Sequence, residues 1–435
     1  MHKKLHFGTA QAWFIWSLTV VFVLFFFNIQ TGYAVMAPLI EKDLVLTVSQ
    51  VGIIGATYTF AFAIVQFASG TFLDKFGLKK TMPWAVLLVT LGALIYSLAN
   101  SAWMLSAAQV VLAVGASFGF IGAGFASRRW FAAAKYGLLF GMVQGIESFG
   151  AAVSQPLLAF LTRFYDWRYL LGGFFVFGLF LTLAFFAWVR DPDEKSFDNK
   201  LDGERIFDEV YGEIRSCLKV PEVVLVALIS GASFGVMIAV GTLWGPRLID
   251  AHGFGGGIIA TAVAWLGQAF GSPALNIWSN HVKSRKLPLI ISIFCQLLVV
   301  TGIIYLPHTS DFFIVVLMFL LGFFSATNML CFAVAGDIVP LKLIGSASAV
   351  INATSFIVGG LAMVIPAFLL SEQIDPSLAS FQKALLIMPI CLLIALALSF
   401  FVKETFRKEH ESGKKEEEEL LGNLAGMTVG EGQVI

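Results

Sequence analysis

Charge and cysteine are scarce in this sequence. Only 13% of its 435 residues are charged, and its 28 Lys and Arg balance its 28 Asp and Glu. Soluble domains carry about 25% charged residues. A chain with a net charge of +0 offers no general attraction to nucleic acid, so we expect no nucleic-acid partner. The four cysteines are dispersed, and their spacing indicates no disulfide framework.

Other absences narrow the possible functions. None of the six histidines lies in the middle of a hydrophobic run, which argues against a histidine metal site or proton relay there. No H-E-x-x-H and no pair of aspartates occurs in such a run, so a membrane-embedded enzyme would lack its catalytic groups. We therefore expect no enzymatic activity, no metal and no cofactor. No polar segment is long enough to form the soluble domain of a receptor.

Long hydrophobic runs dominate what is present. Hydrophobic residues make up 58% of the chain, 43 of its residues are Phe, and the mean hydropathy is +0.85. A membrane-crossing helix needs about 20 apolar residues, so the runs predict an all-α membrane protein with twelve transmembrane helices. The first run follows two lysines without an A-x-A-like cleavage site, and we expect it to be a span rather than a removable signal. The expected ranges are 13–37, 49–72, 82–99, 103–126, 136–161, 168–189, 222–246, 257–278, 287–306, 312–333, 344–370 and 384–402.

Basic residues are distributed unevenly between the two sides of the membrane that twelve spans define. Of the 28 Lys and Arg, 23 fall on the side of the termini. The positive-inside rule then places both termini in the cytoplasm. The N-x-S/T match at Asn352 lies inside a predicted span, which favours a bacterial inner membrane over a glycosylated one. The five basic residues on the other side are Lys42, Arg163, Arg168, Arg247 and Lys383.

A polar segment divides the runs into two groups of six. We expect a first bundle over 1–190, a cytoplasmic linker over 191–220, a second bundle over 221–403 and a disordered cytoplasmic tail over 404–435. Within the linker, apolar residues recur at helical spacing and predict a short amphipathic helix on the membrane surface. These residues are Ile206, Phe207, Val210, Tyr211, Ile214 and Leu218.

A short polar motif, G-x-x-x-D-x-x-G-x-K-K, connects the second and third predicted spans. Its first glycine would let two helices approach closely, its second would permit a turn, and its aspartate would place a negative group beside a helix end. Its lysines would hold the turn in the cytoplasm. The motif residues are Gly70, Asp74, Gly77, Lys79 and Lys80. The motif resembles the signature loop between helices 2 and 3 of the major facilitator superfamily of secondary transporters.

The second half of the chain carries a degraded copy of this motif at 276–286, with Asn280 in the place of Asp74. The segments 137–144 and 345–352, which enter the fifth and eleventh predicted spans, also resemble each other. The resemblance to the superfamily covers roughly residues 13–403. It implies two pseudo-symmetric six-helix bundles, with substrate held between them near the middle of the membrane.

The resemblance also implies an inner gate. Asp74 would meet Arg128 or Arg129 at the end of the fourth span, together with the start of the eleventh span, and so lock the inner gate while the transporter faces outward. Asp337, just before Pro340, would be its counterpart in the second half. The alternative is a set of ordinary charges on the cytoplasmic rim.

Glu147 is a lone acid in the fifth predicted span, about twelve residues into it and so near the bilayer centre. An ionised carboxylate costs several kcal/mol at that depth. Its polar neighbours would point inward, and we expect the carboxyl to be protonated part of the time, as proton coupling requires. The alternative is a permanently neutral Glu that hydrogen-bonds across helices. The neighbours are Gln144, Gly145, Ser148 and Gly150.

Uncharged polar and aromatic residues are scattered through the other predicted spans. Amides, phenols and indoles suit a neutral or zwitterionic solute, and no basic residue lies in the centre of a span to bind an anion. Each of these residues can equally serve helix packing. The expected cavity residues are Asn28, Gln30, Tyr33, Tyr58, Gln66, Gln109, Gln144, Trp244, Trp265, Gln268, Asn328 and Asn352.

These features predict a secondary transporter that imports a small neutral or zwitterionic organic solute by alternating access, as a proton symporter. Its partners would be the solute, the proton and the lipid bilayer, and we expect a monomer. Gln109 stands where many proton-linked members of the superfamily have an arginine, so proton linkage rests on Glu147. The fifth span lacks the G-x-x-x-G-P-x-x-G-G run of drug/proton antiporters, which favours import. An efflux antiporter for drugs, siderophores or metabolites, an organic-anion carrier and a channel stay open.

Overall fold

A computed structural model describes residues 8–131, 135–192, 203–307, 310–340, 343–371 and 376–406. Within these ranges the chain is helical and contains no strand. Lipid offers no hydrogen-bond partner to the backbone, so a chain that crosses a membrane must satisfy its own amides, as a helix does. The predicted all-α class is confirmed. Residues 193–202 of the linker and 407–435 of the predicted tail lie outside the described ranges.

The helices of the first half are α1 (Ala10–Thr31), α2 (Tyr33–Asp43), α3 (Val48–Ser97), α4 (Ala102–Ala116), α5 (Gly119–Trp130), α6 (Tyr136–Leu161) and α7 (Trp167–Trp188). The linker contains α8 (Gly203–Leu218). The second half contains α9 (Pro221–Ala239), the π-helical turn η3 (Val240–Trp244), α10 (Gly245–Ala251), α11 (Gly257–His281), α12 (Lys286–Tyr305), α13 (Asp311–Ser325), α14 (Thr327–Ile338), α15 (Ile344–Leu369), α16 (Leu378–Ala384) and α17 (Ile387–Ser399).

The described helices are long and apolar enough for many membrane crossings. Ten segments qualify as spans by length and composition. One of them, α3, has 50 residues and contains two spans that meet at a kink at Gly77. A further crossing is formed by α6, which has 26 residues. The helices are therefore consistent with the twelve spans that the hydrophobic runs predict.

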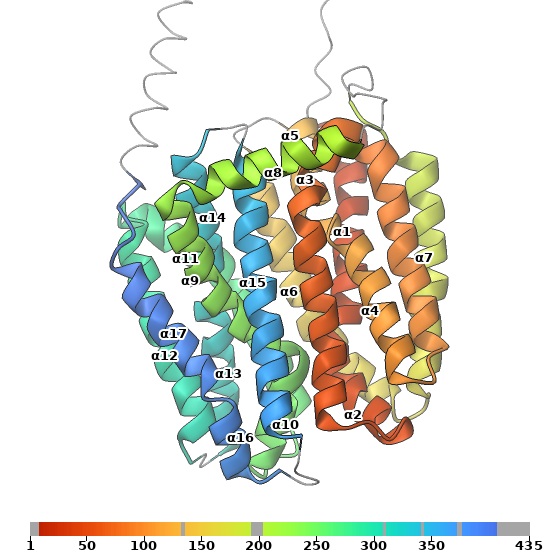
Figure 1. Ribbon diagram of the computed structural model, residues 1–435, viewed down its shortest axis with the longest axis vertical. Helices are drawn as coiled ribbons and strands as arrows, with labels where there is room; N and C mark the ends of the chain where they lie inside the picture. Colours follow the sequence, from red (N-terminus) through yellow and green to blue (C-terminus); the bar gives the residue numbers. More distant parts are fainter. Residues whose placement is uncertain are drawn as a thin grey trace, which may run out of the picture.

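Two bundles of helices stand side by side (Figure 1). Helices α1 to α7 form one bundle, α9 to α17 form the other, and α8 lies across one end of both. We call the face crossed by α8 the linker face, and the face that carries α2, α10 and α16 the opposite face. The bundles meet along two seams, α3 against α15 and α6 against α11. A site between the bundles is therefore flanked by these four helices.

Small residues and stacked rings hold the α3–α15 seam together. Phe62 stacks on Phe356 with ring centroids 4.0 Å apart. A Cβ added to Gly52 would lie 2.2 Å from Ala367 Cβ, so only glycine allows the two backbones to come this close. Helices in lipid gain little from the hydrophobic effect when they associate, and close packing of this kind takes its place.

Equivalent spans of the two halves are interrupted near their middle. The first span breaks at Gly32, between α1 and α2, and the seventh passes through η3 between α9 and α10. The fourth span breaks at 117–118 and the tenth at Ala326. A break takes main-chain carbonyls out of the regular helical ladder, and these carbonyls then need other donors. The hydrophobic runs pass through all four breaks, so they are not visible as gaps in hydropathy.

Helix α8 is the amphipathic helix predicted in the linker. Its Val210 and Cys217 are buried and its Tyr211 is exposed. Its Glu213 accepts hydrogen bonds from Thr71 of α3 (3.3 Å) and from Ser346 of α15 (2.6 Å). The linker helix thus contacts both bundles with one carboxylate at the linker face.

Candidate functional site

Glu147 lies near the middle of α6 and is 7% exposed. Its Oε2 has no hydrogen-bond partner among the described residues. On the same helix, Gln144 donates a 3.3 Å hydrogen bond to Ser148, and Tyr58 of α3 lies within electrostatic range of the Glu147 carboxyl. A buried carboxyl with an unpaired oxygen is stable when neutral and costly when charged.

Other buried polar groups in the first bundle also lack a hydrogen-bond partner in the described structure, and Gln30 and Tyr58 are among them. Both amide atoms of Gln30 in α1, and the hydroxyl of Tyr58, make no hydrogen bond within the part of the chain that the structure describes. Gln30 is 6% exposed and Tyr58 3%. An unpaired buried amide or hydroxyl costs roughly 1–3 kcal/mol. With Glu147, the side chains of Gln30 and Tyr58 are candidate contacts for a polar solute.

Glu147 stands apart from the other buried charges. Among the described residues, the acidic and basic side chains that are less than 9% exposed include Glu147, Asp191, Arg285 and Asp337, and Asp337 pairs with Arg285. Asp191 and Arg285 lie at the linker face and are hydrogen-bonded there. Glu147 is thus the buried acid in the membrane interior, where an ionisable group is by default a functional candidate.

Four of the predicted cavity residues form hydrogen bonds with one another. Asn352 of α15 donates to Gln66 of α3 (3.3 Å), so this pair joins the two bundles. Gln268 of α11 donates to Asn328 of α14 (3.5 Å), inside the second bundle, and accepts from Ser325. A solute that entered here would have to replace these bonds.

Four of the remaining predicted cavity residues, Asn28, Tyr33, Trp244 and Trp265, use polar atoms in contacts between helices, which is the alternative considered for each of them. Tyr33 donates to the Val51 carbonyl (2.7 Å), Trp244 to the Ala362 carbonyl (3.1 Å) and Trp265 to the Gly241 carbonyl (3.3 Å). Asn28 accepts from Ser154 (2.9 Å), and Gln109 is 4% exposed in α4. Within the predicted set, Gln30 and Tyr58 are the residues with buried polar atoms that make no hydrogen bond in the described part of the chain.

The path between the bundles is closed at the opposite face. Arg247 of α10 pairs with Glu41 of α2, and these helices belong to different bundles. Beneath this pair, Gln155 of α6 donates to the main chain of both bundles. The sequence analysis missed Gln155. Gln155 follows Gln144 by three helical turns and Ser148 by two, so the three side chains share one face of α6. This spacing is the sequence feature that indicates a further polar residue on that face.

Several glycines at the linker face have room beside them. A Cβ added to Gly141 of α6, Gly336 of α14 or Gly345 of α15 would meet no described atom within 4 Å. The same holds for Gly70 of α3, so the expected close helix approach at this glycine is wrong for this conformation. These four glycines therefore have room for a side chain, whereas Gly77 at the same face does not, because an added Cβ would lie 2.5 Å from the Asp191 carboxylate.

The signature motif forms a kink rather than a loop. Helix α3 continues to Phe76, and the turn is reduced to Gly77, whose φ of +74° is a value that L side chains rarely adopt. The carboxylate of Asp191, at the end of the sixth span, accepts the next two main-chain N–H groups, those of Leu78 and Lys79 (both 3.0 Å). It thereby caps the helix that begins the third span.

Asp74 contacts Arg128 at the end of α5, with 2.6 Å between Oδ1 and Nη2. The two side chains are 52% and 46% exposed. The guanidinium groups of Arg128 and Arg129 also lie 5.5 and 5.2 Å from the Phe125 ring centroid. Lys79 and Lys80 are exposed at the linker face. The gate residues predicted for the first half therefore lie together at the linker face of the first bundle.

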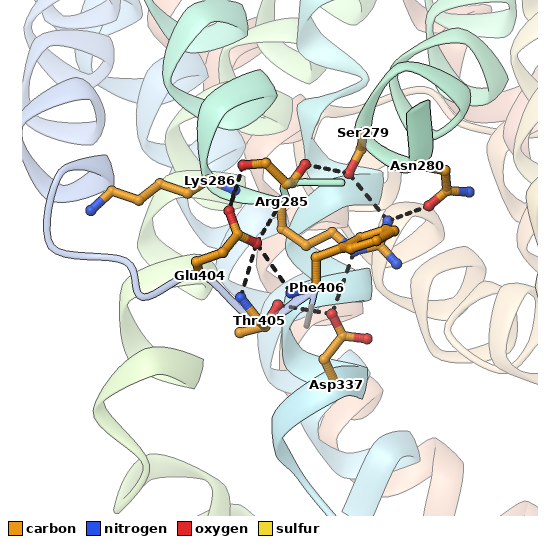
Figure 2. A network of polar contacts seen from close by, with 9 residues as sticks. Ser279, Asn280, Arg285, Lys286, Asp337, Glu404, Thr405 and Phe406 are labelled. Atoms are coloured by element: carbon orange, nitrogen blue, oxygen red, sulfur yellow. Dashed lines mark hydrogen bonds and ion pairs between the residues drawn. The ribbon is translucent and has the colours of Figure 1, made fainter. Parts of the chain in front are cut away.

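The second bundle repeats this construction with a different acid, as Figure 2 shows. Lys283 stands where Gly77 stands in the motif and has a φ of +51°. Glu404, after the twelfth span, accepts the main-chain N–H groups of Arg285 (2.8 Å) and Lys286 (3.3 Å) and the hydroxyl of Ser284. Two helix starts, one in each half, are thus capped by an acid that follows the last span of that half.

The ion pair is also repeated, but its charges are exchanged between the two helices. In the first half the motif supplies the acid, Asp74, and the span end supplies the base. In the second half the motif supplies Arg285, and the span end supplies Asp337 (3.4 Å). Asn280, at the place of Asp74, accepts from Arg285 (2.8 Å). Asp337 is therefore the counterpart of the basic partner rather than of Asp74.

The ordered chain extends past the predicted start of the tail at 404. Thr405 donates to Asp337 (2.8 Å), and the Phe406 ring lies 5.1 Å from the Arg285 guanidinium. Both residues are almost fully buried. The charged composition of the tail concealed this segment, because its polar atoms are used in contacts with the second bundle.

The pH dependence of stability tests the Glu404 cap. Burial alone would raise the pKa of Glu404, but hydrogen bonds from Arg285, Ser284, Phe406 and Lys286 hold that pKa below its usual value. A depressed folded pKa stabilises the fold above the unfolded pKa of about 4.3, and this stabilisation is lost as pH falls through the folded value. We expect Glu404→Gln to lower the thermal midpoint at pH 7. Below about pH 4, the thermal midpoint of the variant should approach that of the wild type.

The matched control is Glu209→Gln, which removes an exposed acid of α8. Its thermal midpoint should follow that of the wild type across the same pH range. A difference between Glu404→Gln and wild type that does not change with pH would contradict the cap.

Comparison with known proteins agrees with this architecture. The family model described as Major Facilitator Superfamily matches residues 18–309 and 255–429. An uncharacterized transporter of Bacillus subtilis, YybO, is 21% identical over 411 residues, which cover 90% of this chain and 93% of that protein. The hexuronate transporter of Bacillus subtilis is 20% identical over 337 residues, or 73% of this chain and 78% of that protein.

A solved structure shares the fold. A bacterial homologue of the human lysosomal transporter Spinster, in an inward-facing and unoccupied conformation, has a TM-score of 0.71 and 14% sequence identity. The match covers 92% of this chain and 98% of that one. Two six-span bundles, the signature motif at the second span and a family match over most of the chain lead to one conclusion. The chain belongs to the Major Facilitator Superfamily and is a multi-pass membrane transporter.

Proposed function

We propose that this protein is a proton-coupled secondary transporter that moves a small polar organic solute by alternating access. The observation that carries the proposal is Glu147, a buried acid in the membrane interior with an unpaired oxygen. Binding a proton there removes a charge that the surroundings do not compensate, so protonation and conformation are linked. The opposite face, where an ion pair and the Gln155 amide join the bundles, is closed as in one of the two states of such a cycle.

The linker face is the cytoplasmic face in this proposal, and both termini lie on that side. The support is the excess of Lys and Arg in the segments at this face, together with the positive-inside rule. The protein would then sit in a bacterial inner membrane as a monomer, and transport would run inward with the proton. Glu147 is the proton-coupling residue, and Gln30 and Tyr58 are the solute contacts with unused hydrogen-bonding capacity.

The proposed solute is neutral or zwitterionic and rich in hydroxyl or amide groups. An amide and a phenol can each donate and accept, which suits hydroxyl groups, and the described spans bury no Lys or Arg at the depth of Glu147. A sugar acid is the second candidate, because the similar Bacillus subtilis protein is named as a hexuronate transporter. A protonated Glu147 is neutral and would add no second negative charge beside an organic anion.

Uptake into proteoliposomes distinguishes these solutes. The purified protein is tested with labelled glucose, glucuronate and a neutral amino acid, with and without an inward proton gradient. We expect saturable uptake of one class, stimulated by the gradient and subject to counterflow. A thermal-shift screen with the same compounds should show that this class stabilises the protein, since a ligand stabilises the state it binds. A flux that neither saturates nor counterflows would contradict a carrier and indicate a channel.

A further inference from the structure

Gln155 lies where the interrupted first span approaches the interrupted seventh span. It is fully buried in α6, and its Nε2 donates to the carbonyl of Thr31 (2.9 Å) and to the carbonyl of Gly241 (2.8 Å). Thr31 ends α1 in the first bundle, and Gly241 belongs to η3 in the second. Both partners are acceptors, so the amide nitrogen must face them. One side chain therefore bonds to both bundles at once.

These two carbonyls are available because the helices break there. At Gly32 the main-chain N–H of Val35 donates to the Gly32 carbonyl instead of to Thr31. In η3 the N–H of Gly245 donates to Val240, which leaves the Gly241 carbonyl without its usual donor. The following residue, Pro246, has no N–H to offer. The breaks thus release one acceptor from each bundle, and Gln155 binds both.

The surroundings of Gln155 keep it dry. Trp265 of α11 donates to the same Gly241 carbonyl (3.3 Å), and its ring packs edge-on against Phe27 of α1, with centroids 5.1 Å apart. The Arg247–Glu41 pair lies nearer the surface, with side chains 16% and 23% exposed. A hydrogen bond shielded from water in this way is stronger than an exposed one. The opposite face is closed by an outer ion pair and, beneath it, by the Gln155 amide.

We propose that Gln155 holds the transport path closed at the opposite face, by binding the two carbonyls released at the breaks of the first and seventh spans. This inference rests on the alternating access proposed above. The bond to Gly241 crosses between bundles, so it must break when they separate at that face. Gln155 therefore acts as a positioning residue that sets the balance between the two states, without a role in proton binding.

Two cysteine reporters measure that balance in purified protein in nanodiscs, with the four native cysteines replaced. Ala37→Cys reports on the opposite face. Ala37 is 1% exposed and lies one turn before Glu41 on the same side of α2. Because α2 packs against η3 of the other bundle, separation of the bundles at this face would expose Ala37. Gly336→Cys reports on the linker face, where an added Cβ meets no described atom within 4 Å. The readout is the rate of labelling by a water-soluble maleimide, followed by mass.

We expect Gln155→Met, which keeps the side-chain length, to increase labelling of Ala37→Cys by about tenfold, or about 1.4 kcal/mol. The loss of a shielded hydrogen bond between the bundles is large enough for such a shift. Labelling of Gly336→Cys should decrease, because opening one face closes the other. If Gln155→Met does not fold, Gln155→Asn removes one methylene, draws the amide back from the carbonyls and should give the same pair of changes.

The matched control is Gln382→Met. Gln382 of α16 also donates its amide to a main-chain carbonyl, that of Ile304 (2.9 Å), but both residues belong to the second bundle. It should leave both labelling rates unchanged. Unchanged protection of Ala37→Cys in the Gln155 variants, or faster labelling of both reporters, would overturn the proposal, since general loosening exposes both faces. The assay uses neither solute nor proton gradient, so its outcome is independent of Glu147.

Discussion

Replacing Glu147 with Gln is expected to abolish uptake driven by a pH gradient, while exchange of solute across the membrane continues. Glutamine has nearly the shape of a protonated glutamate but cannot release a proton. The empty carrier would then change conformation without a proton, and the gradient could no longer drive accumulation. The measurement is uptake of the identified solute into proteoliposomes with and without an imposed gradient, beside counterflow in the same vesicles.

Two variants control this experiment. Glu147→Asp keeps a titratable group in the spans and should retain gradient-driven uptake in part. Glu209→Gln removes an exposed acid of α8 and should behave as wild type. Unchanged gradient dependence in Glu147→Gln would show that the carboxyl has a structural role, as a neutral group that hydrogen-bonds between helices.

The second large effect is expected at the linker face, where two related ion pairs differ in burial. The Arg285 and Asp337 side chains are 7% and 6% exposed, whereas those of Arg128 and Asp74 are 46% and 52% exposed. Removing one partner of a buried pair leaves an uncompensated charge and costs about 3–5 kcal/mol, whereas an exposed pair contributes about 0–1 kcal/mol. We expect Asp337→Asn to cost about 3 kcal/mol, since Arg285 keeps Asn280 as a partner.

Asp74→Asn is the matched variant for this comparison. It should leave the thermal midpoint close to wild type, and we propose that it slows conformational cycling with little change in solute affinity, because Asp74 belongs to the inner gate. Thermal unfolding in detergent compares the two variants, and turnover in proteoliposomes tests the gate. Equal losses of stability would contradict the burial argument, and wild-type turnover in Asp74→Asn would remove Asp74 from the gate.

Glu147 can be recognised as a functional candidate from the sequence, whereas Gln155 cannot. A carboxylate in the middle of an apolar run is improbable unless it has a function, so Glu147 is conspicuous in the sequence. A glutamine is not, because its amide can satisfy itself in many ways along a span. The importance of Gln155 depends on two carbonyls that are remote in the chain, at Thr31 and Gly241, and on the proline that leaves one of them without a donor.

In the motif at Gly77, the turn is likewise predictable from the sequence, whereas the residue that caps it is not. The need for a glycine at a turn follows from the spacing of the motif, and the φ of +74° agrees with it. The acid that caps this turn, Asp191, follows the sixth span and lies 113 residues after Leu78 in the chain. Its counterpart Glu404 was assigned to a disordered tail. Caps supplied by distant segments leave no periodic signal, so the sequence pattern assigns Asp191 to a polar linker and Glu404 to a disordered tail.

The sequence by itself determined the all-α class, the approximate spans, the duplication, the family and the buried acid. These follow from local quantities: hydropathy over about 20 residues, charge on either side of a span and the spacing of one motif. Only the tertiary structure decided which face is closed, which polar groups are already paired and which remain open. Those properties depend on contacts between helices far apart in the chain, and in lipid such contacts are selected by close packing and hydrogen bonding rather than by hydrophobic pattern.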